Sequence, residues 1–136
     1  MCIRDSHYPD RFRANPAPAE IAAFFTRQIA EDNAFVDFAK WENQAAGYTF
    51  CTLNVRDGSP ISFPTRHLHV EHIAVTPEHQ RKGIATALLS HAGARAKTLG
   101  CTEINLTSWA ANDGAHTAFE TAGFHKARYW FARPVD

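Results

Sequence analysis

Two stretches of this sequence carry side chains whose types and spacing could do chemistry. The first is the run His-Leu-His-Val-Glu-His at 67–72. Because strand side chains alternate between faces, Glu71 and Ile73 share one face and His72 points to the other. A carboxylate, or an imidazole that titrates near neutrality, can take a proton from a nucleophile. Glu71 is therefore the candidate general base, with His72 and His69 as alternatives.

The second stretch joins an apolar strand pattern to a long helical stripe. That stripe opens with Gln80, Arg81, Lys82, Gly83, Ile84, Ala85 and Thr86. The first amides of a helix lack partners within it, and the helix dipole is positive at that end. Gly83 lets a ligand approach the backbone, and Arg81 and Lys82 add positive charge. The pattern predicts an anion site suited to a pyrophosphate. The alternative is an ordinary helix start with exposed basic residues.

The same histidine-rich strand also suggests a metal site. His67, His69 and Glu71 alternate onto one strand face, and such a set can bind a divalent ion. A fourth ligand at a suitable spacing is missing from the sequence. We therefore predict no metal, and we interpret the alternation as that of a half-exposed strand.

Hydrophobic periodicity and turn residues predict the elements that must position these groups. Helices are expected at 18–31, 82–99 and 112–121, and strands at 35–41, 48–55, 67–75, 103–108 and 127–133. The strand–helix–strand unit over 67–108 requires a right-handed crossover, so its two strands should be parallel neighbours. The hairpin connections before it are antiparallel. The sheet is therefore expected to be mixed, with helices covering it.

Composition sets the limits on fold and partners. The chain has 136 residues, of which 45% are hydrophobic, enough for one globular domain. Its 14 Lys and Arg balance its 14 Asp and Glu, which argues against nucleic acid or anionic membrane as a partner. No run approaches the length of a membrane helix. Three cysteines without a C-x-x-C pair favour a reducing setting, so we expect a cytoplasmic protein.

Two motifs resemble the GNAT superfamily of acyl-CoA N-acyltransferases. Residues 72–89 are similar to its coenzyme-A segment, a strand ending in V-x-P followed by Q/R-x-x-G-x-G/A. The matching residues are Val75, Pro77, Gln80, Gly83 and Ala85. Residues 112–124 resemble a second segment, N-x-x-A-x-x-F-Y-x-x-x-G-F. The matching residues are Asn112, Ala115, Ala118, Phe119, Gly123 and Phe124.

The resemblance implies an α/β fold. Its mixed, mostly antiparallel sheet has a central splayed parallel strand pair and flanking helices. It implies acetyl-CoA as co-substrate, transfer of its acetyl group to a primary amine of a small molecule or peptide, and a possible homodimer. The implied coenzyme contacts are the strand residues Ile73, Ala74 and Val75, the helix start at 80–86, and Asn112, Ala115 and Phe119. The amine should lie among the first helix, the loop at 56–66 and the C-terminal strands.

One position departs from the family pattern. The tyrosine that often protonates the leaving thiolate in this family is replaced by Phe119, which has no proton to donate. Another group such as Tyr129 could act instead, or the thiolate could leave unassisted. A non-catalytic acyl-CoA-binding or regulatory module on the same fold is the alternative function.

The N-terminal residues do not match the family pattern. Residues 1–17 are polar and punctuated by proline, so we expect an irregular segment there and a single domain over 18–136. The first strand of the family fold is expected to be missing. The strand at 35–42 would then be an exposed edge.

Overall fold

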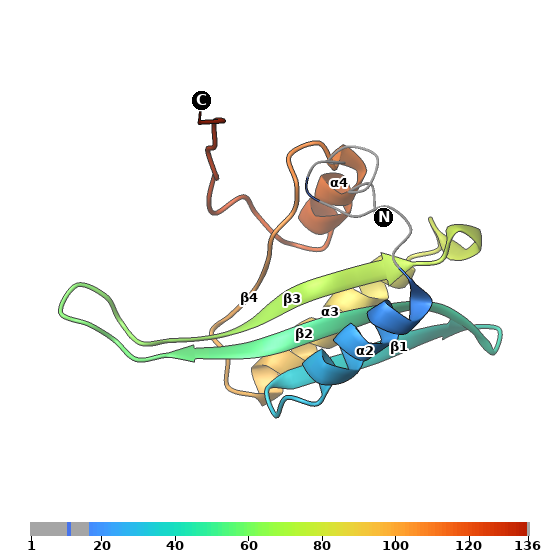
Figure 1. Cartoon of the computed structure of the whole chain (residues 1–136), viewed down its shortest axis with the longest axis horizontal. Coiled ribbons are helices and arrows are strands. Elements are labelled where there is room, and N and C mark those ends of the chain that lie inside the picture. The colour runs from blue at the N-terminus through green and yellow to red at the C-terminus, as the bar shows by residue number, and fades with distance from the viewer. Residues whose placement is uncertain (1–10, 12–16, 136) are drawn as a thin grey trace.

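A four-stranded sheet organises the protein, and Figure 1 shows its strands running side by side. The structure is a computed structural model that describes residue 11 and residues 17–135. The strands are β1 (Ala34–Trp41), β2 (Gln44–Arg56), β3 (Thr65–Val75) and β4 (Glu103–Leu106), in the spatial order β1-β2-β3-β4. β1, β2 and β3 pair antiparallel, and β3 pairs parallel with β4. The predicted mixed sheet with one parallel pair is confirmed.

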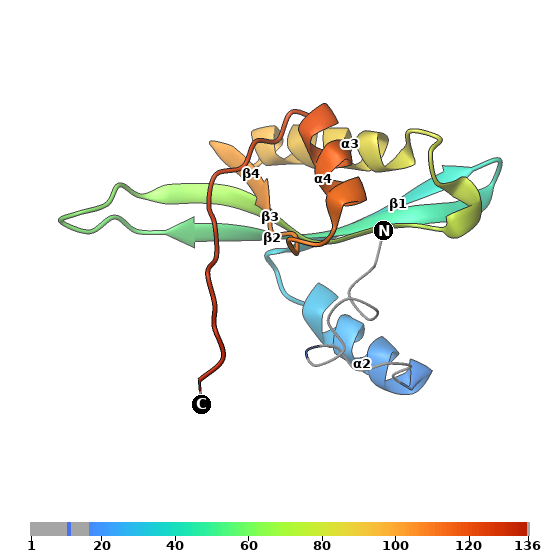
Figure 2. The same ribbon diagram turned by 90° about the horizontal axis from the view of Figure 1, so that it is seen from above.

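Helices lie on both faces of this sheet. They are α2 (Pro18–Ile29), the short 3-10 helix η1 (Pro77–His79), α3 (Ile84–Thr98) and α4 (Asp113–Thr121). Figure 2 shows α3 and α4 on one face and α2 on the other. α3 is the crossover between the parallel strands, and it stops before Gly100, whose positive φ of 72° favours glycine. No helix in the described part of the chain is long and apolar enough to cross a membrane.

The main core lies between the sheet and the α3 side. Its buried members are Cys51, Leu68, Val70, Leu89, Ala92, Ala96, Ala115 and Phe119. They come from β2, β3, α3 and α4, so burial of apolar surface fixes these four elements against one another. By contrast, α2 has no buried residue. It contacts the opposite face through Phe25, whose ring meets those of Phe50 and His72 edge-on.

A β-bulge interrupts the pairing of β2 and β3. Cys51 pairs with Val70 and the preceding Phe50 pairs with His72, so Glu71 is an extra residue in β3. Two β3 residues therefore lie opposite one β2 residue. After the bulge, the alternation of β3 side chains between the two faces is shifted by one residue. The expectation that His72 points away from the Glu71 face was wrong. His72 and Glu71 both lie on the α2 face, whereas Ile73 packs against the core on the α3 face.

The strand predicted at 127–133 was also wrong. Residues 124–135 form no regular element, and Figure 2 shows this segment running away from the sheet. Trp130 and Phe131 are 89% and 90% exposed. Aromatic residues favour a strand only where a neighbouring strand offers pairing and packing, and within residues 17–135 this segment pairs with no strand.

The predicted missing first strand would have paired with β1, at the edge of the sheet. Within residues 17–135, β1 pairs only with β2. The predicted irregular segment at 1–17 and the missing first strand fall on residues 1–10 and 12–16. These lie outside the described residues.

Candidate functional site

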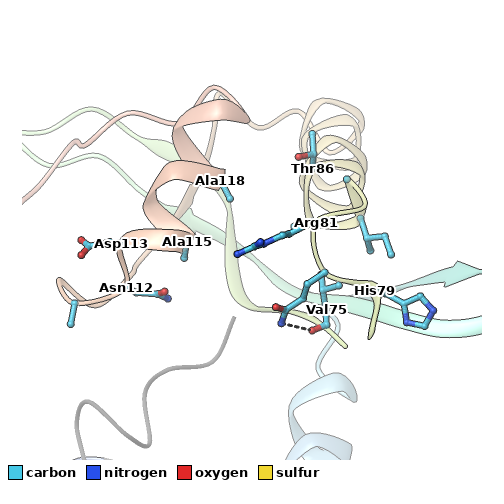
Figure 3. A pocket seen from close by; sticks show the side chains of 14 residues that line it. Val75, His79, Arg81, Thr86, Asn112, Asp113, Ala115 and Ala118 are labelled. Atoms are coloured by element: carbon cyan, nitrogen blue, oxygen red, sulfur yellow. Dashed lines mark hydrogen bonds between the residues drawn. The ribbon is translucent and has the colours of Figure 1, made fainter. Parts of the chain in front are cut away.

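A cavity of about 740 Å³ opens between the N-terminal ends of α3 and α4, beside the end of β3 (Figure 3). The predicted coenzyme residues that line it are Val75, Gln80, Arg81, Gly83, Ile84, Ala85, Thr86, Asn112 and Ala115. The structure thus brings the two sequence motifs, which are separated by a strand and a helix, to one site.

The backbone leading into α3 presents groups at this cavity that favour an anion. Gly83 is the N-cap with φ 79°, and no side chain caps the helix. The first-turn amides after it have no partner within the helix, and the positive end of the helix dipole lies among them. Arg81 also has a positive φ, 62°, and Figure 3 shows its side chain crossing the cavity toward Ala118. Unpaired amides, a dipole and a guanidinium together suit a pyrophosphate.

Four of the predicted coenzyme residues do not line the cavity. The Lys82 ammonium lies over the ring of Trp41, 5.1 Å from its centroid. Phe119 is buried in the core, edge-on to Phe124. Ile73 packs against the core, and Ala74 pairs with Tyr48 in the β2–β3 ladder.

The free edge of β3 borders the same cavity. Pairing between β3 and β4 ends at Val70 with Leu106. Thr76 N–H donates to Ala46 O of β2 at 2.8 Å, so the backbone groups of Val75 and Ile73 point to the other side, toward the gap beyond β4. The Gln80 side-chain amide donates to Val75 O at 3.4 Å, which shows that this oxygen is accessible from the cavity side. An extended ligand arm can pair there like an added strand.

Glu71 lies where β3 and β4 separate. Thr52 Oγ1 donates to its Oε1 at 2.8 Å, and its Oε2 is 4.0 Å from His69 Nε2. The Glu71 and His69 side chains are 39% and 25% exposed, so a ligand can reach both. The third candidate base, His72, lies between aromatic rings, stacked on Phe50 and edge-on to Phe25.

Two other chemical possibilities concern a nucleophilic cysteine and a metal. Burial of Cys51, assisted by the nearby Asp37 carboxylate, raises the pKa of its thiol to about 11, so it stays protonated and unreactive at neutral pH.

Among residue 11 and residues 17–135, no group of three or more His, Cys, Asp and Glu side chains could hold a metal ion.

Sequence reasoning missed several residues that line the cavity: His79, Ala111, Asp113, Gly114 and Ala118. Helical spacing could have found Ala118, which lies three residues after Ala115 on the same face of α4. His79 is buried, and its Nδ1 lies 2.7 Å from Thr76 Oγ1, an interaction within the turn that the sequence pattern does not reveal.

The profile of the acetyltransferase (GNAT) family matches residues 3–124. The chain belongs to the GNAT acetyltransferase family. A curated relative from Acinetobacter haemolyticus, an aminoglycoside N(6')-acetyltransferase type 1, is 30% identical over 115 residues, which are 79% of this chain and 75% of the relative. Family and relative together make this GNAT protein an acyltransferase.

Solved structures agree on the fold. A mutant of the BH1408 protein from Bacillus halodurans superposes with a TM-score of 0.90 at 16% identity, covering 97% of this chain and 84% of that one. The aminoglycoside N-acetyltransferase AAC(6')-Iy in complex with CoA has a TM-score of 0.68 at 18% identity, covering 87% of this chain and 88% of that one. These likenesses place the GNAT fold over nearly the whole described chain.

Proposed function

We propose that this GNAT protein transfers the acetyl group of acetyl-CoA to a primary amine of a small molecule or peptide. The observation that carries this is the arrangement around the end of the β3–β4 pairing. The helix start of α3 lines the cavity beside the free edge of β3, and the Glu71 carboxylate lies on the α2 face where β3 and β4 separate. The CoA-bound structure of a protein with the same fold supports the choice of coenzyme.

Each part of acetyl-CoA has a matching part of the site. The α3 amides and Arg81 hold the pyrophosphate, and the backbone groups of Ile73 and Val75 pair with the amides of the pantetheine arm. Asn112 and Ala115, at the start of α4, close the other side of the cavity. In this arrangement the thioester reaches the β-bulge beside Glu71. A backbone N–H released from the ladder there is the donor for the developing oxyanion.

The chemistry is direct attack of a neutral amine on the thioester carbonyl. Glu71 takes a proton from the amine, the new C–N bond forms, and the C–S bond breaks. Phe119 provides no acid, and it is buried in the core. Because a thiol is acidic enough to leave as its thiolate, the coenzyme sulfur leaves unassisted and takes its proton from water.

The acceptor we propose is a small-molecule amine. Its support is the relative from Acinetobacter haemolyticus, which is named as acting on aminoglycosides. The amine reaches the site from the α2 face, on which Glu71 and His69 are exposed. The loop between β2 and β3, where the amine was expected, carries the aromatic ring of Phe63, which is 90% exposed.

The direct test measures thiol release from acetyl-CoA over a panel of aminoglycosides, polyamines, amino acids and peptides. We expect amine-dependent release with at least one small-molecule amine, and mass spectrometry should find the product heavier by one acetyl group. Coenzyme binding without turnover on any amine would favour the non-catalytic acyl-CoA-binding module instead.

We also propose a cytoplasmic homodimer. Its support is the exposed aromatic segment at 127–133 and the outer edge of β4, which has no partner strand within residues 17–135. The occupant we assign to that edge is the same segment of a second copy, added as a strand. Acetyl-CoA as co-substrate fits a cytoplasmic setting.

A further inference from the structure

A chain of hydrogen bonds crosses β2, β3 and β4 on the α2 face of the sheet. On one side, Asn54 Nδ2 donates to Thr52 Oγ1 at 3.3 Å, and Thr52 Oγ1 donates to Glu71 Oε1 at 2.8 Å. On the other side, His69 Nδ1 lies 2.7 Å from Asn105 Oδ1, and Asn105 Nδ2 donates to Glu103 Oε1 at 2.6 Å. The two sides meet at Glu71 and His69.

The carboxylate of Glu103 fixes which atom of Asn105 faces His69. An ionised carboxylate only accepts hydrogen bonds, so the amide nitrogen of Asn105 must point toward Glu103. The amide oxygen must then point toward His69. Because that oxygen only accepts, His69 Nδ1 must carry the hydrogen. Asn105 therefore holds the neutral imidazole as its Nδ1–H tautomer, and Nε2 is left with a free lone pair.

Two acceptors consequently face one another across a short gap. Oε1 of Glu71 already accepts from Thr52, and its Oε2 lies 4.0 Å from His69 Nε2. If a nitrogen lay about 2.8 Å from both Glu71 Oε2 and His69 Nε2, the angle at that nitrogen between the two acceptors would be roughly 90°. This is close to the angle between two N–H bonds of one nitrogen. The gap is thus shaped for a group with at least two N–H donors.

We propose that His69 is a second catalytic base, acting with Glu71 on the same amine, and that Asn105 is its positioning residue. The inference rests on the proposed function, because it assigns roles within that site. The charged or titratable groups facing His69 are Glu71 on its own strand and Glu103, through Asn105, on β4. The neighbouring β2 contributes the neutral Thr52 and Asn54.

Two bases match the proton count of the reaction. A primary amine enters as its ammonium ion, R–NH3⁺, and leaves as an amide that keeps one N–H, so two protons must depart. The first departs to give the free amine, whose lone pair forms the C–N bond. The second departs as the C–S bond breaks and the coenzyme leaves as thiolate. Glu71 Oε2 and His69 Nε2 take one proton each and pass both protons to solvent, and the thiolate takes its proton from water.

The tautomer is tested without turnover. Imidazole nitrogen shifts from two-dimensional ¹⁵N–¹H spectra of the full chain should show His69 protonated at Nδ1 and not at Nε2 at pH 8. In Asn105→Leu that preference should be lost. The double variant Asn105→Asp with Glu103→Gln exchanges carboxylate and amide at constant charge, and it should restore Nδ1–H. An Nε2–H or doubly protonated His69 in the unmodified protein would overturn the proposal.

Kinetics then test the role in catalysis. With an amine that the unmodified protein acetylates, His69→Gln should lower kcat about 100-fold and leave the Kd for acetyl-CoA unchanged, a loss typical of a removed base. Asn105→Leu should lower kcat about tenfold. The double variant Asn105→Asp with Glu103→Gln should recover kcat, and its pH–rate profile should shift to higher pH. His67→Gln, a change on the same strand outside the network, is the matched control.

The outcomes separate this inference from the proposed function. If the unmodified protein acetylates no amine, the proposed function fails, whatever tautomer the spectra show. If it is active and His69→Gln turns over as fast as His67→Gln, only the second base is wrong.

Discussion

The face of His72 depends on one extra residue in β3. Alternation alone keeps Glu71 on the face of His69, but the bulge places two β3 residues opposite one β2 residue and so turns His72 onto the same face. A regular ladder would have placed His72 against the core, where an imidazole loses hydration. The bulge therefore places all three candidate bases on one face of the sheet.

The first prediction concerns the carboxylate. Glu71→Gln keeps the shape and the hydrogen bond from Thr52 but cannot take a proton at neutral pH. Turnover should fall about 100-fold or more, with little change in the Kd for acetyl-CoA, because the coenzyme contacts lie elsewhere. Steady-state kinetics with coenzyme titration check this. Glu120→Gln, on the exposed side of α4, is the control, and near-normal turnover of Glu71→Gln would shift the role to a histidine or to water.

The second prediction concerns Cys51, whose thiol pKa is raised from 9.0 to about 11 by burial and then by Asp37. Between those two values the unfolded thiol loses its proton while the folded one keeps it. Stability should therefore fall as the pH rises through this window, by up to about 1.4 kcal/mol per pH unit. In Cys51→Ala this loss is absent, so the difference in unfolding free energy between the two proteins should shrink from pH 9 to pH 11. Urea denaturation at each pH measures it, and a constant difference would contradict the assignment.

Single residues were the hardest to predict from sequence. The alternation of 67–72 correctly grouped Glu71 with His69. Strict period two wrongly grouped Glu71 with Ile73 and put His72 on the other face, because a bulge depends on how the partner strand pairs. Lys82 was expected at the anion site because of its charge. Its stacking on Trp41 depends on the β1–β2 hairpin, which lies far away in sequence.

At the scale of elements, the turn into α3 is where we propose that the coenzyme pyrophosphate binds. Gly83 holds φ 79° at the N-cap, and a Cβ added there would meet nothing within 4 Å. The space is open, so a short side chain would extend toward the ligand rather than into the protein. Asn and Asp tolerate this backbone conformation better than other residues with side chains.

This allows a charge test with matched shape. Gly83→Asn and Gly83→Asp have almost the same volume and the same tolerance of positive φ, but only the second places an anion beside the pyrophosphate. Like charges about 4 Å apart near a surface repel by roughly 4 kcal/mol. We expect the Kd for acetyl-CoA to rise at least about tenfold more in Gly83→Asp than in Gly83→Asn, by calorimetry, at equal melting temperatures. Equal affinities of the two variants for acetyl-CoA would show that the pyrophosphate does not bind at this helix start.

Helices and strands were predicted well where local sequence signals specify them. They were predicted poorly where a strand forms only if another strand pairs with it. The stripe from Ile84 onward and the stop at Gly100 define α3 almost to the residue. The crossover rule correctly gave the parallel β3–β4 pair. The aromatic segment at 127–133 has the composition of a strand, but composition carries no information about which edge will receive it.

At the scale of the whole molecule, the balanced charge of the sequence conceals an uneven distribution. The α3 side carries the main core and the cavity at the start of α3, whereas the α2 face carries Glu71, His69 and Glu103 and is covered by α2, which has no buried residue. In the function we propose, coenzyme and amine approach from opposite faces of one sheet and meet at the β3–β4 gap. Net charge argues against nucleic acid as a partner, but it could not reveal this division.

The final prediction concerns assembly. Trp130 and Phe131 are 89% and 90% exposed on a segment that runs off the sheet, and exposed aromatic residues of this kind are enriched at interfaces between proteins. If the segment adds to β4 of a second copy, the protein is a dimer, and the amides of 127–133 exchange slowly with solvent. Replacing both residues by serine should give a monomer with fast exchange there. Phe63→Ser, which removes an equally exposed aromatic ring in another loop, should remain dimeric. Light scattering coupled to gel filtration, with hydrogen exchange, distinguishes these cases, and a monomer across all accessible concentrations of the unmodified chain would show that β4 does not accept this strand.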